Sequence, residues 1–445
     1  MVRRTLTLLL CTIVICSLAL PVFGQNAKDP RVRLKTYHPA PRGIAPETLR
    51  RFIDAEANSA AAPPVSPLPL AHWGFNVTSS RDGQLYGGVM VGNRALVGGT
   101  GTANIPTQII PVKVNTVALA TDVDFSTGLI TVETGNPGDN TTFDPTAADD
   151  TCLAHPNDVP IRVLRQSPLF NPADFNFGGV DVGVTQFFDA YQRSSFWNTI
   201  DRSSYHVMLN PVKVLDELTL DVPAPAGGSG GLAIDLPNLF PGFGLCGHFG
   251  IVDIFTIDNF VNSQFAALAA KGVHPSSFPV FAFYNVSFSL VDPINIFNCC
   301  AAGYHSASDV GSNGTLLIQT YSAFDFDRTN FFINDDGSGV SDTDIGSHEV
   351  AEWGADPVGG NPTPAWGHTG QVSGCQGNLE VGDPLTGLLS SKIRMPNGFT
   401  YQLQELADFS WFFGSVNGGP PTIGVNRWYS DNATFLTNAG PPCTP

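Results

Sequence analysis

A His-Glu-x-x-Glu segment, about three quarters of the way along the chain, restricts the possible fold more than any other feature. It lies within Ser347-His348-Glu349-Val350-Ala351-Glu352-Trp353. On a helix, His348 and Glu352 project from the same face, with Cβ atoms about 5–6 Å apart. The segment differs by one residue from His-Glu-x-x-His, which holds zinc on a helix beside a general base. The sequence therefore predicts a helix over residues 341–354, with His348 and Glu352 as metal ligands and Glu349 as catalytic base.

A plainer interpretation of the same segment is a solvated surface helix with one His and two Glu side chains. Its neighbours argue for partial burial, because Val350, Ala351 and Trp353 are apolar. Ser341 and Asp344 resemble a capping box at the start of the helix, and Gly354 suits its end. These flanks favour a helix that packs against a core.

A catalytic zinc site has three protein ligands and one open position, so a third ligand is needed. Glu380, His368 and His305 are the candidates. If Glu380 is the ligand, Asp383 is expected to orient a ligand histidine from behind. Two carboxylates among three ligands would also suit manganese, magnesium or calcium, although zinc is the expected ion. Tyr304, beside His305, is a candidate hydrogen-bond donor to a substrate carbonyl. The alternative is that Gly303-Tyr304-His305 is a packing motif at a strand end, held by Cys299 and Cys300.

The N-terminus predicts export. Arg3 and Arg4 precede an apolar run from Thr5 to Leu20, and small residues precede Gln25, so residues 1–24 are expected to be a secretory signal peptide. A membrane anchor is the alternative, but the run is shorter than the ~20 residues of a spanning helix. We therefore expect a secreted, extracellular protein with no transmembrane segment after signal removal.

Cysteine usage agrees with an oxidising compartment. Six cysteines follow the leader: Cys152, Cys246, Cys299, Cys300, Cys375 and Cys443. An even number in an exported chain favours disulfide bonds. Because a bond between adjacent cysteines is strained, Cys299 and Cys300 are expected to pair with different partners.

The formal charge of −17 excludes nucleic acid as an expected partner, since nucleic-acid binding needs a basic face. An extracellular protein or a cell-wall substrate is the expected partner instead. Gly (46) and Pro (35) are frequent and few stretches suit long helices, which favours an α+β fold. We expect a zincin-like domain with a mixed β-sheet and a motif helix, preceded by a β-rich portion.

Four regions follow from the composition: the leader, a Pro/Ala-rich pro-segment or linker over 25–68, a β-rich part over 69–240, and a zincin-like part over 241–445. The patterns predict strands over 108–114, 128–132, 205–209, 213–215, 278–290 and 315–324. They predict further helices over 184–196, 255–271 and 401–411. Strand 315–324 is the expected sheet edge, where an extended substrate would add as a strand.

The motif region resembles the EXORDIUM / phosphate-induced protein family of plants and related uncharacterised exported proteins of bacteria and fungi. The likeness is carried by Ser347 to Glu352, Asp356-Pro357, Trp366-Gly367 and Glu380-x-x-Asp383, and covers mainly residues 280–390. It implies an exported, zincin-like protein and brings no settled enzymatic activity. The present chain departs from the family in a longer Trp366-to-Glu380 segment and in His368.

Two functions from different classes are consistent with the sequence. The first is an exported zinc-binding protein that hydrolyses peptide or ester bonds. The second is a non-catalytic extracellular or cell-surface interaction protein on a degenerate zincin scaffold. Convergence of the predicted ligands in an open cleft would favour the first, whereas a buried, water-free cluster or splayed side chains would favour the second.

Overall fold

The structure is a computed structural model that describes residues 29–59, 66–96, 98–135, 141–177, 180–200, 203–367, 375–387 and 390–414. Within these ranges the chain is a strand-rich α+β fold, as predicted. The predicted signal peptide lies outside the described residues. The helices are α1 (Pro46–Ala57), α2 (Pro160–Arg165), α3 (Phe187–Ser195), α4 (Trp197–Ile200), α5 (Leu236–Leu239), α6 (Ile254–Ala269), α7 (Asp344–Ala355) and α8 (Phe409–Phe413).

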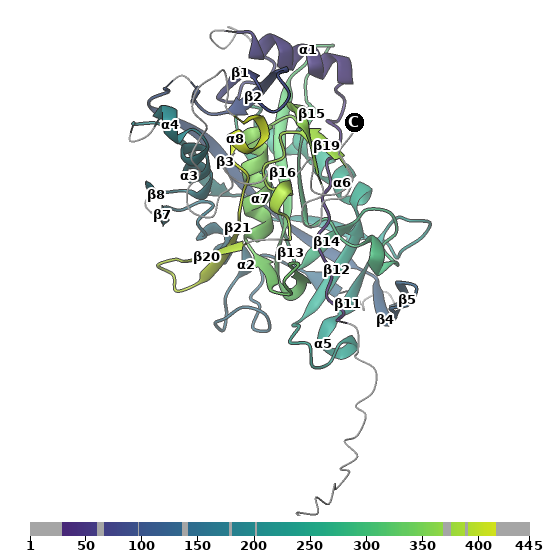
Figure 1. The fold of residues 1–445 in the computed structure, drawn as a ribbon. Coiled ribbons are helices and arrows are strands. Elements are labelled where there is room, and N and C mark those ends of the chain that lie inside the picture. Colours follow the sequence, from purple (N-terminus) through teal and green to yellow (C-terminus); the bar gives the residue numbers. More distant parts are fainter. Residues whose placement is uncertain are drawn as a thin grey trace, which may run out of the picture.

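A mixed sheet of eight strands forms the centre of the molecule (Figure 1). Strands β3 (Thr102–Thr116), β13 (Phe278–Tyr284) and β16 (Ile318–Ile333) are parallel neighbours, and β15 (Gly303–Asp309) pairs antiparallel with β16. The other members are β6 (Thr141–Phe143), β9 (His206–Val214), β10 (Leu218–Val222) and β17 (Gly339–Asp342). The prediction that 315–324 is the edge strand is wrong, because β15 lies outside β16 and ends the sheet.

A second sheet of five strands packs beside the first. Its order is β14 (Val286–Ser289), β12 (His248–Asp253), β11 (Gly231–Asp235), β4 (Ala118–Asp124) and β5 (Leu129–Thr134). The single strand predicted over 278–290 is divided at Asn285, whose φ is 55°. This left-handed residue redirects the chain, so that β13 and β14 enter different sheets.

Four strand pairs complete the fold. They are β1 (His72–Thr78) with β2 (Leu85–Val91), β7 (Ala173–Phe177) with β8 (Val180–Thr185), β18 (Pro362–Gly367) with β19 (Cys375–Asn378), and β20 (Ser390–Arg394) with β21 (Thr400–Gln404). The helix predicted over 401–411 is wrong in its first half, which is strand β21. Only its end is helical, in α8.

The two faces of the central sheet belong to two hydrophobic cores. Along β13, Phe281 and Phe283 join the core of α6, whereas Val280 and Ala282 join the core of α7. This alternation follows from the two-residue period of a strand. The predicted helices 184–196 and 255–271 are present as α3 and α6, and 341–354 as α7. Helix α7 begins later than predicted, since Ser341 lies in β17 and Thr343 is the N-cap.

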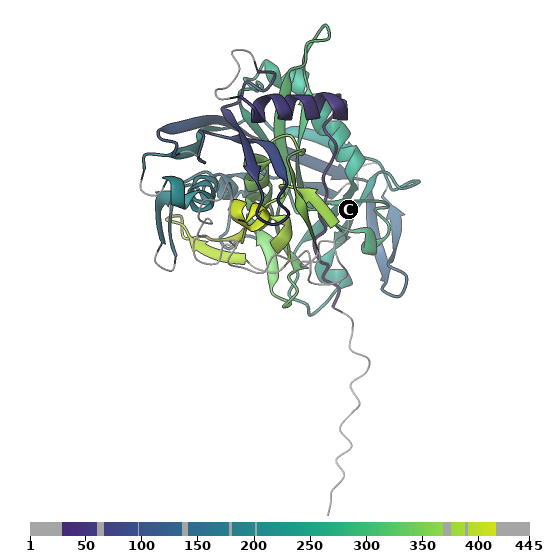
Figure 2. The ribbon, with the colours of Figure 1, turned by 45° about the horizontal axis from the view of Figure 1, so that its top comes forward.

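The N-terminal segment is packed against the rest of the chain. Leu34, Ile44, Phe52 and Ile53 belong to the large core that also contains α7. Figures 1 and 2 show α1, in purple, at one end of the molecule beside β1 and β2. The sequence predicts no core element here, because the Pro/Ala-rich composition conceals the apolar face of α1.

Cysteine pairing is in part as expected. Cys152 is bonded to Cys246, while Cys299 and Cys300 are bonded to each other, so the prediction of separate partners for them is wrong. Cys375 is also disulfide-bonded, and Cys443 lies outside the described residues. Among the described helices, none combines the length and apolar character needed to span a membrane.

Candidate metal centre

Helix α7 is buried along its whole length, which excludes the surface-helix interpretation of the motif. Trp353 stacks on Phe278 of β13 with ring centroids 3.6 Å apart. Its indole N–H donates to Thr320 Oγ1 of β16 at 2.9 Å. These contacts hold α7 on the sheet and turn His348 and Glu352 toward the loop that follows β19.

His348 and Glu352 converge as their spacing predicts, and Asp383 joins them. His348 Nε2 lies 2.9 Å from Glu352 Oε2 and 3.4 Å from Asp383 Oδ1. Two ligands about 2.1 Å from a tetrahedral zinc ion lie roughly 3.4 Å apart. The three donor atoms therefore fit one divalent cation, and all three residues are buried.

The other ring nitrogen of His348 and the other carboxylate oxygen of Glu352 are held by hydrogen bonds. His348 Nδ1 lies 2.9 Å from Gln404 Oε1, and an amide oxygen only accepts, so this contact assigns the proton to Nδ1. With Nδ1 protonated, Nε2 is the ring nitrogen that could bind a cation shared with the carboxylates. Glu352 Oε1 accepts from the backbone N–H groups of Gly382 and Asp383 at 3.0 and 3.1 Å. This is the supporting arrangement typical of metal ligands.

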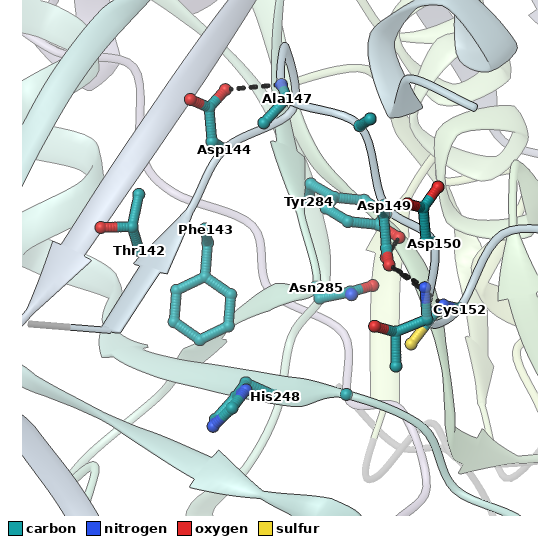
Figure 3. A pocket seen from close by; sticks show the side chains of 13 residues that line it. Thr142, Phe143, Asp144, Ala147, Asp149, Asp150, Cys152, His248, Tyr284 and Asn285 are labelled. Carbon is teal, nitrogen blue, oxygen red and sulfur yellow. Dashed lines mark hydrogen bonds between the residues drawn. The ribbon is translucent and has the colours of Figure 1, made fainter. Parts of the chain in front are cut away.

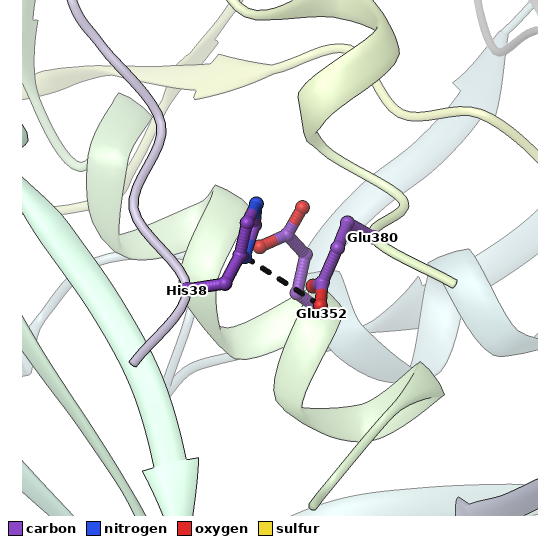
Figure 4. Close-up of side chains that lie close together, drawn as sticks. All are labelled: His38, Glu352 and Glu380. Atoms are coloured by element: carbon purple, nitrogen blue, oxygen red, sulfur yellow. Dashed lines mark ion pairs between the residues drawn. The ribbon is translucent and has the colours of Figure 1, made fainter. Parts of the chain in front are cut away.

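Glu380 and an unpredicted residue, His38, form a second group around Glu352 (Figure 4). His38 Nδ1 lies 3.5 Å from Glu380 Oε1, and its Nε2 lies 2.7 Å from Asp383 Oδ2. Asn378 donates to Glu380 Oε1 at 2.8 Å. In Figure 4 the imidazole reaches from the N-terminal coil toward Glu352 of α7 and Glu380.

His305 closes the site from β15, whereas Tyr304 does not reach it. His305 Nδ1 lies 3.6 Å from Glu349 Oε2 and 3.7 Å from Glu352 Oε2, and its Nε2 contacts Asp356 O at 3.0 Å. Tyr304, the adjacent residue, points to the opposite face of the sheet and packs in the α6 core. The alternation of strand β15 thus explains why only one of the two belongs to the site.

Glu349 borders a small cavity of about 20 Å³ that is also lined by His348, Gly303, Thr386 and Gln404. This volume is enough for about one water molecule. Burial raises the pKa of Glu349 to about 7, against the opposing charge of His348. A Cβ on Gly303 would lie 2.7 Å from Glu349 Oε1, so this glycine leaves room for the carboxylate.

Five buried carboxylates gather here without a lysine or arginine partner among the described residues: Glu349, Glu352, Asp356, Glu380 and Asp383. Glu380 Oε2 and Asp383 Oδ1 have no hydrogen-bond donor within the described part of the chain. Burial raises the pKa of Glu380 well above its ordinary value despite nearby His38. Burial alone would lower the pKa of His348, but Glu352 and Glu349 outweigh it and raise that pKa well above its usual range. A buried excess of negative charge calls for a cation.

The predicted site residues therefore meet, with changes in detail. Glu380 and Asp383 both reach Glu352, and it is Asp383 that also reaches His348. His368, the alternative third ligand, lies outside the described residues. The sequence does not predict His38, Gln404 or Thr386. His38 and Gln404 are far from the motif in sequence, and none of the three stands in a recognisable pattern.

A larger hollow of about 240 Å³ lies elsewhere, between β6, β12 and the chain around Cys152 (Figure 3). Its acidic side chains serve local turns. Asp144 Oδ1 accepts from Ala147 N at 3.1 Å, and Asp149 Oδ1 accepts from Cys152 N at the same distance. The hollow therefore offers no cluster comparable to that around Glu352.

Comparison with known proteins adds no relative. No family model, no curated protein and no solved structure matches this chain.

Proposed function

We propose that this protein is an exported, zincin-like metallohydrolase that acts on peptide or ester bonds, with zinc as the expected ion. His348, Glu352 and Asp383 would hold the metal, with Glu380 and His305 as nearby donors. The observation that carries the proposal is the meeting of these side chains around Glu352 Oε2, with no lysine or arginine among the described residues to balance the carboxylates. The position of α7 on the sheet beside the edge strand β15 supports the zincin-like comparison.

A bound divalent cation would polarise a substrate carbonyl and make an attacking water more acidic. The chain supplies the remaining parts. Glu349 is the proton acceptor, since its pKa of about 7 suits a base at neutral pH and it borders a water-sized cavity. Gln404 fixes the His348 ring, and the backbone of Gly382 and Asp383 fixes Glu352.

The test compares His348→Ala with Glu349→Gln by elemental analysis of the purified protein and by a peptidase and esterase screen. We expect stoichiometric metal in the parent protein, loss of metal in His348→Ala, and retained metal with abolished hydrolysis in Glu349→Gln. Loss of metal in Glu349→Gln would make Glu349 a ligand and refute its assigned role. Absence of metal in the parent protein after incubation with zinc, manganese and calcium would refute the metal site.

The second candidate is a non-catalytic extracellular or cell-surface interaction protein that keeps the scaffold. The burial of the cluster favours it, because Glu352 and Glu380 are 1% and 0% exposed. The same metal analysis separates the two: metal without hydrolysis of any screened bond, in parent and Glu349→Gln alike, supports this candidate.

A further inference from the structure

The N-terminal coil lies along the outer edge of the central sheet and is hydrogen-bonded to it at separate points. Arg42 N donates to Ala307 O of β15 at 2.8 Å, and Asp309 N donates to Arg42 O at 2.9 Å. Lys35 N donates to Cys300 O just before β15. Val32 pairs in the same parallel manner with Phe332 of β16. Figure 1 shows this purple coil descending from α1 along the molecule.

The same coil covers the metal centre. Leu34, Lys35 and Thr36 form one wall of the cavity beside His348 and Glu349. Two residues further on, His38 reaches Asp383 at 2.7 Å and Glu380 at 3.5 Å. The imidazole of His38 and the carboxylates of Glu352 and Glu380 offer donor atoms within 4.8 Å of one another, so His38 could ligate a cation held by Glu352.

We propose that residues 31–42 are a built-in inhibitory segment, with His38 closing the open metal position of a cleft that accepts extended polypeptides. This inference rests on the metal site of the proposed function and adds its substrate class and its regulation. The free edge of β15 offers backbone donors and acceptors at the spacing of a polypeptide strand. A polypeptide can satisfy that repeat, and the N-terminal coil does so at Arg42.

His38 suits the role of a removable ligand. Its side chain is 28% exposed, whereas the Glu380 and Asp383 side chains it contacts are fully buried. It is carried by a coil at a sheet edge, while His348 and Glu352 are fixed on a buried helix. Displacement of the coil would uncover the β15 edge and the metal position in one step.

The test loads the full chain with cobalt(II) and follows its removal by EDTA through the visible spectrum of the ion. The variant is His38→Ala. His155→Ala is the matched control, because the His155 side chain is 61% exposed and its ion-pair partner among the described residues is nearby Asp158. We expect cobalt release at least about tenfold faster from His38→Ala, a changed cobalt spectrum, and parental behaviour from His155→Ala. Circular dichroism checks that each variant is folded.

Three results would overturn the inference, and they are distinguishable. Equal release rates and spectra for the parent and His38→Ala would remove His38 from the metal position while leaving the metal site intact. Complete loss of cobalt binding in His38→Ala would make His38 a permanent ligand. A parent protein that binds no cobalt would refute the proposed function together with this inference.

Amide hydrogen exchange tests the segment separately from the metal. The Asp309 amide donates to Arg42 O, so its exchange reports whether the coil stays on β15. We expect faster exchange at Asp309 in His38→Ala and no change in His155→Ala. An unchanged rate would show that His38 does not hold the coil in place, and would overturn the inhibitory role of the segment.

Discussion

At the scale of single residues, Gly382 determines where the His348 ring can lie. A Cβ at Gly382 would stand 2.5 Å from His348 Nδ1. The backbone of Gly382 also donates to Glu352 Oε1 and accepts from Gln404 Nε2. One residue without a side chain thus touches both helix ligands and the amide that orients the imidazole.

We predict that Gly382→Ala lowers metal affinity by about 10–100-fold, since the His348 ring must move away from its partners. The overpacking should also lower the free energy of unfolding by about 1–3 kcal/mol. Metal titration and denaturant unfolding measure the two effects. Gly377→Ala is the control, because its nearest neighbour would be 3.9 Å from the new Cβ. Parental affinity in Gly382→Ala would contradict the proposed packing.

The helical pair in the site could be predicted from the sequence, whereas its remaining members could not. His348 and Glu352 meet because a spacing of four residues has one geometric meaning on a helix. Glu380 lies in a loop and Asp383 begins a 3-10 turn, where spacing does not determine direction. His38 meets Asp383 across 345 positions of the chain, and no local pattern encodes such a contact.

At the scale of elements, α3 and α7 approach closely where Gly354 lies under Phe188. A Cβ on Gly354 would meet Phe188 Cε2 at 1.9 Å. Gly354 is expected to end the helix, but α7 continues to Ala355. The glycine serves helix–helix contact, and the position of α7 on the sheet depends on it.

We therefore predict that Gly354→Ala lowers the free energy of unfolding by about 1–3 kcal/mol. Adding Phe188→Leu, which removes the clashing ring atoms, should make the loss in the double variant smaller than the sum of the two single losses. Urea unfolding of the parent protein, the two single variants and the double variant gives the coupling free energy between the two positions. Strict additivity would show that the two side chains do not compete for this space.

Two predictions of secondary structure failed because tertiary contacts, and not the local sequence pattern, determine the structure there. Residues 400–404 are buried at four positions in succession, a pattern shared by a buried helix and a buried strand. Pairing with β20 selects the strand. The division at Asn285 depends on a turn in the left-handed region, and the buried Asp325 accepts from the next amide, Val286 N, at 3.1 Å.

At the scale of the whole molecule, the Cys152–Cys246 bond joins two segments 94 residues apart. Closing so long a loop restricts the unfolded chain. We predict that the double variant Cys152→Ser/Cys246→Ser unfolds with a free energy about 2–5 kcal/mol lower. Thermal unfolding beside the parent protein measures this. An unchanged transition would mean that the bond is absent or that the unfolded chain is already compact.

The buried acids give the metal-free protein a defined pH dependence. Burial raises the pKa of Asp342 to about 6 and that of Asp344 to about 7, from ordinary values near 3.8. Between about pH 4 and 7 the folded state therefore keeps protons that the unfolded state has lost, so the free energy of unfolding falls as pH rises. We predict a lower Tm at pH 8 than at pH 5 in the presence of EDTA.

Bound metal should reverse this fall in the free energy of unfolding with pH, because the ligands bind a metal ion in their deprotonated forms. The rise in Tm on adding zinc is expected to grow from pH 5 to pH 8. At a zinc concentration about one hundred times Kd, the gain would be about 2.7 kcal/mol. A zinc-induced rise that stays constant over this range would contradict ligation by His348 and the buried carboxylates.

The pairing of residues 32–42 with β15 and β16 also determines the order in which the molecule can be assembled. The earliest part of the described chain waits for strands that are synthesised about 270 positions later, as the pairing of Arg42 with Ser308 shows. Contacts of such long range are formed late and slowly. The acidic centre and its His38 cover would then form in the same late stage of folding, and with the inhibitory role proposed for residues 31–42 a newly folded molecule would be latent from its first moment.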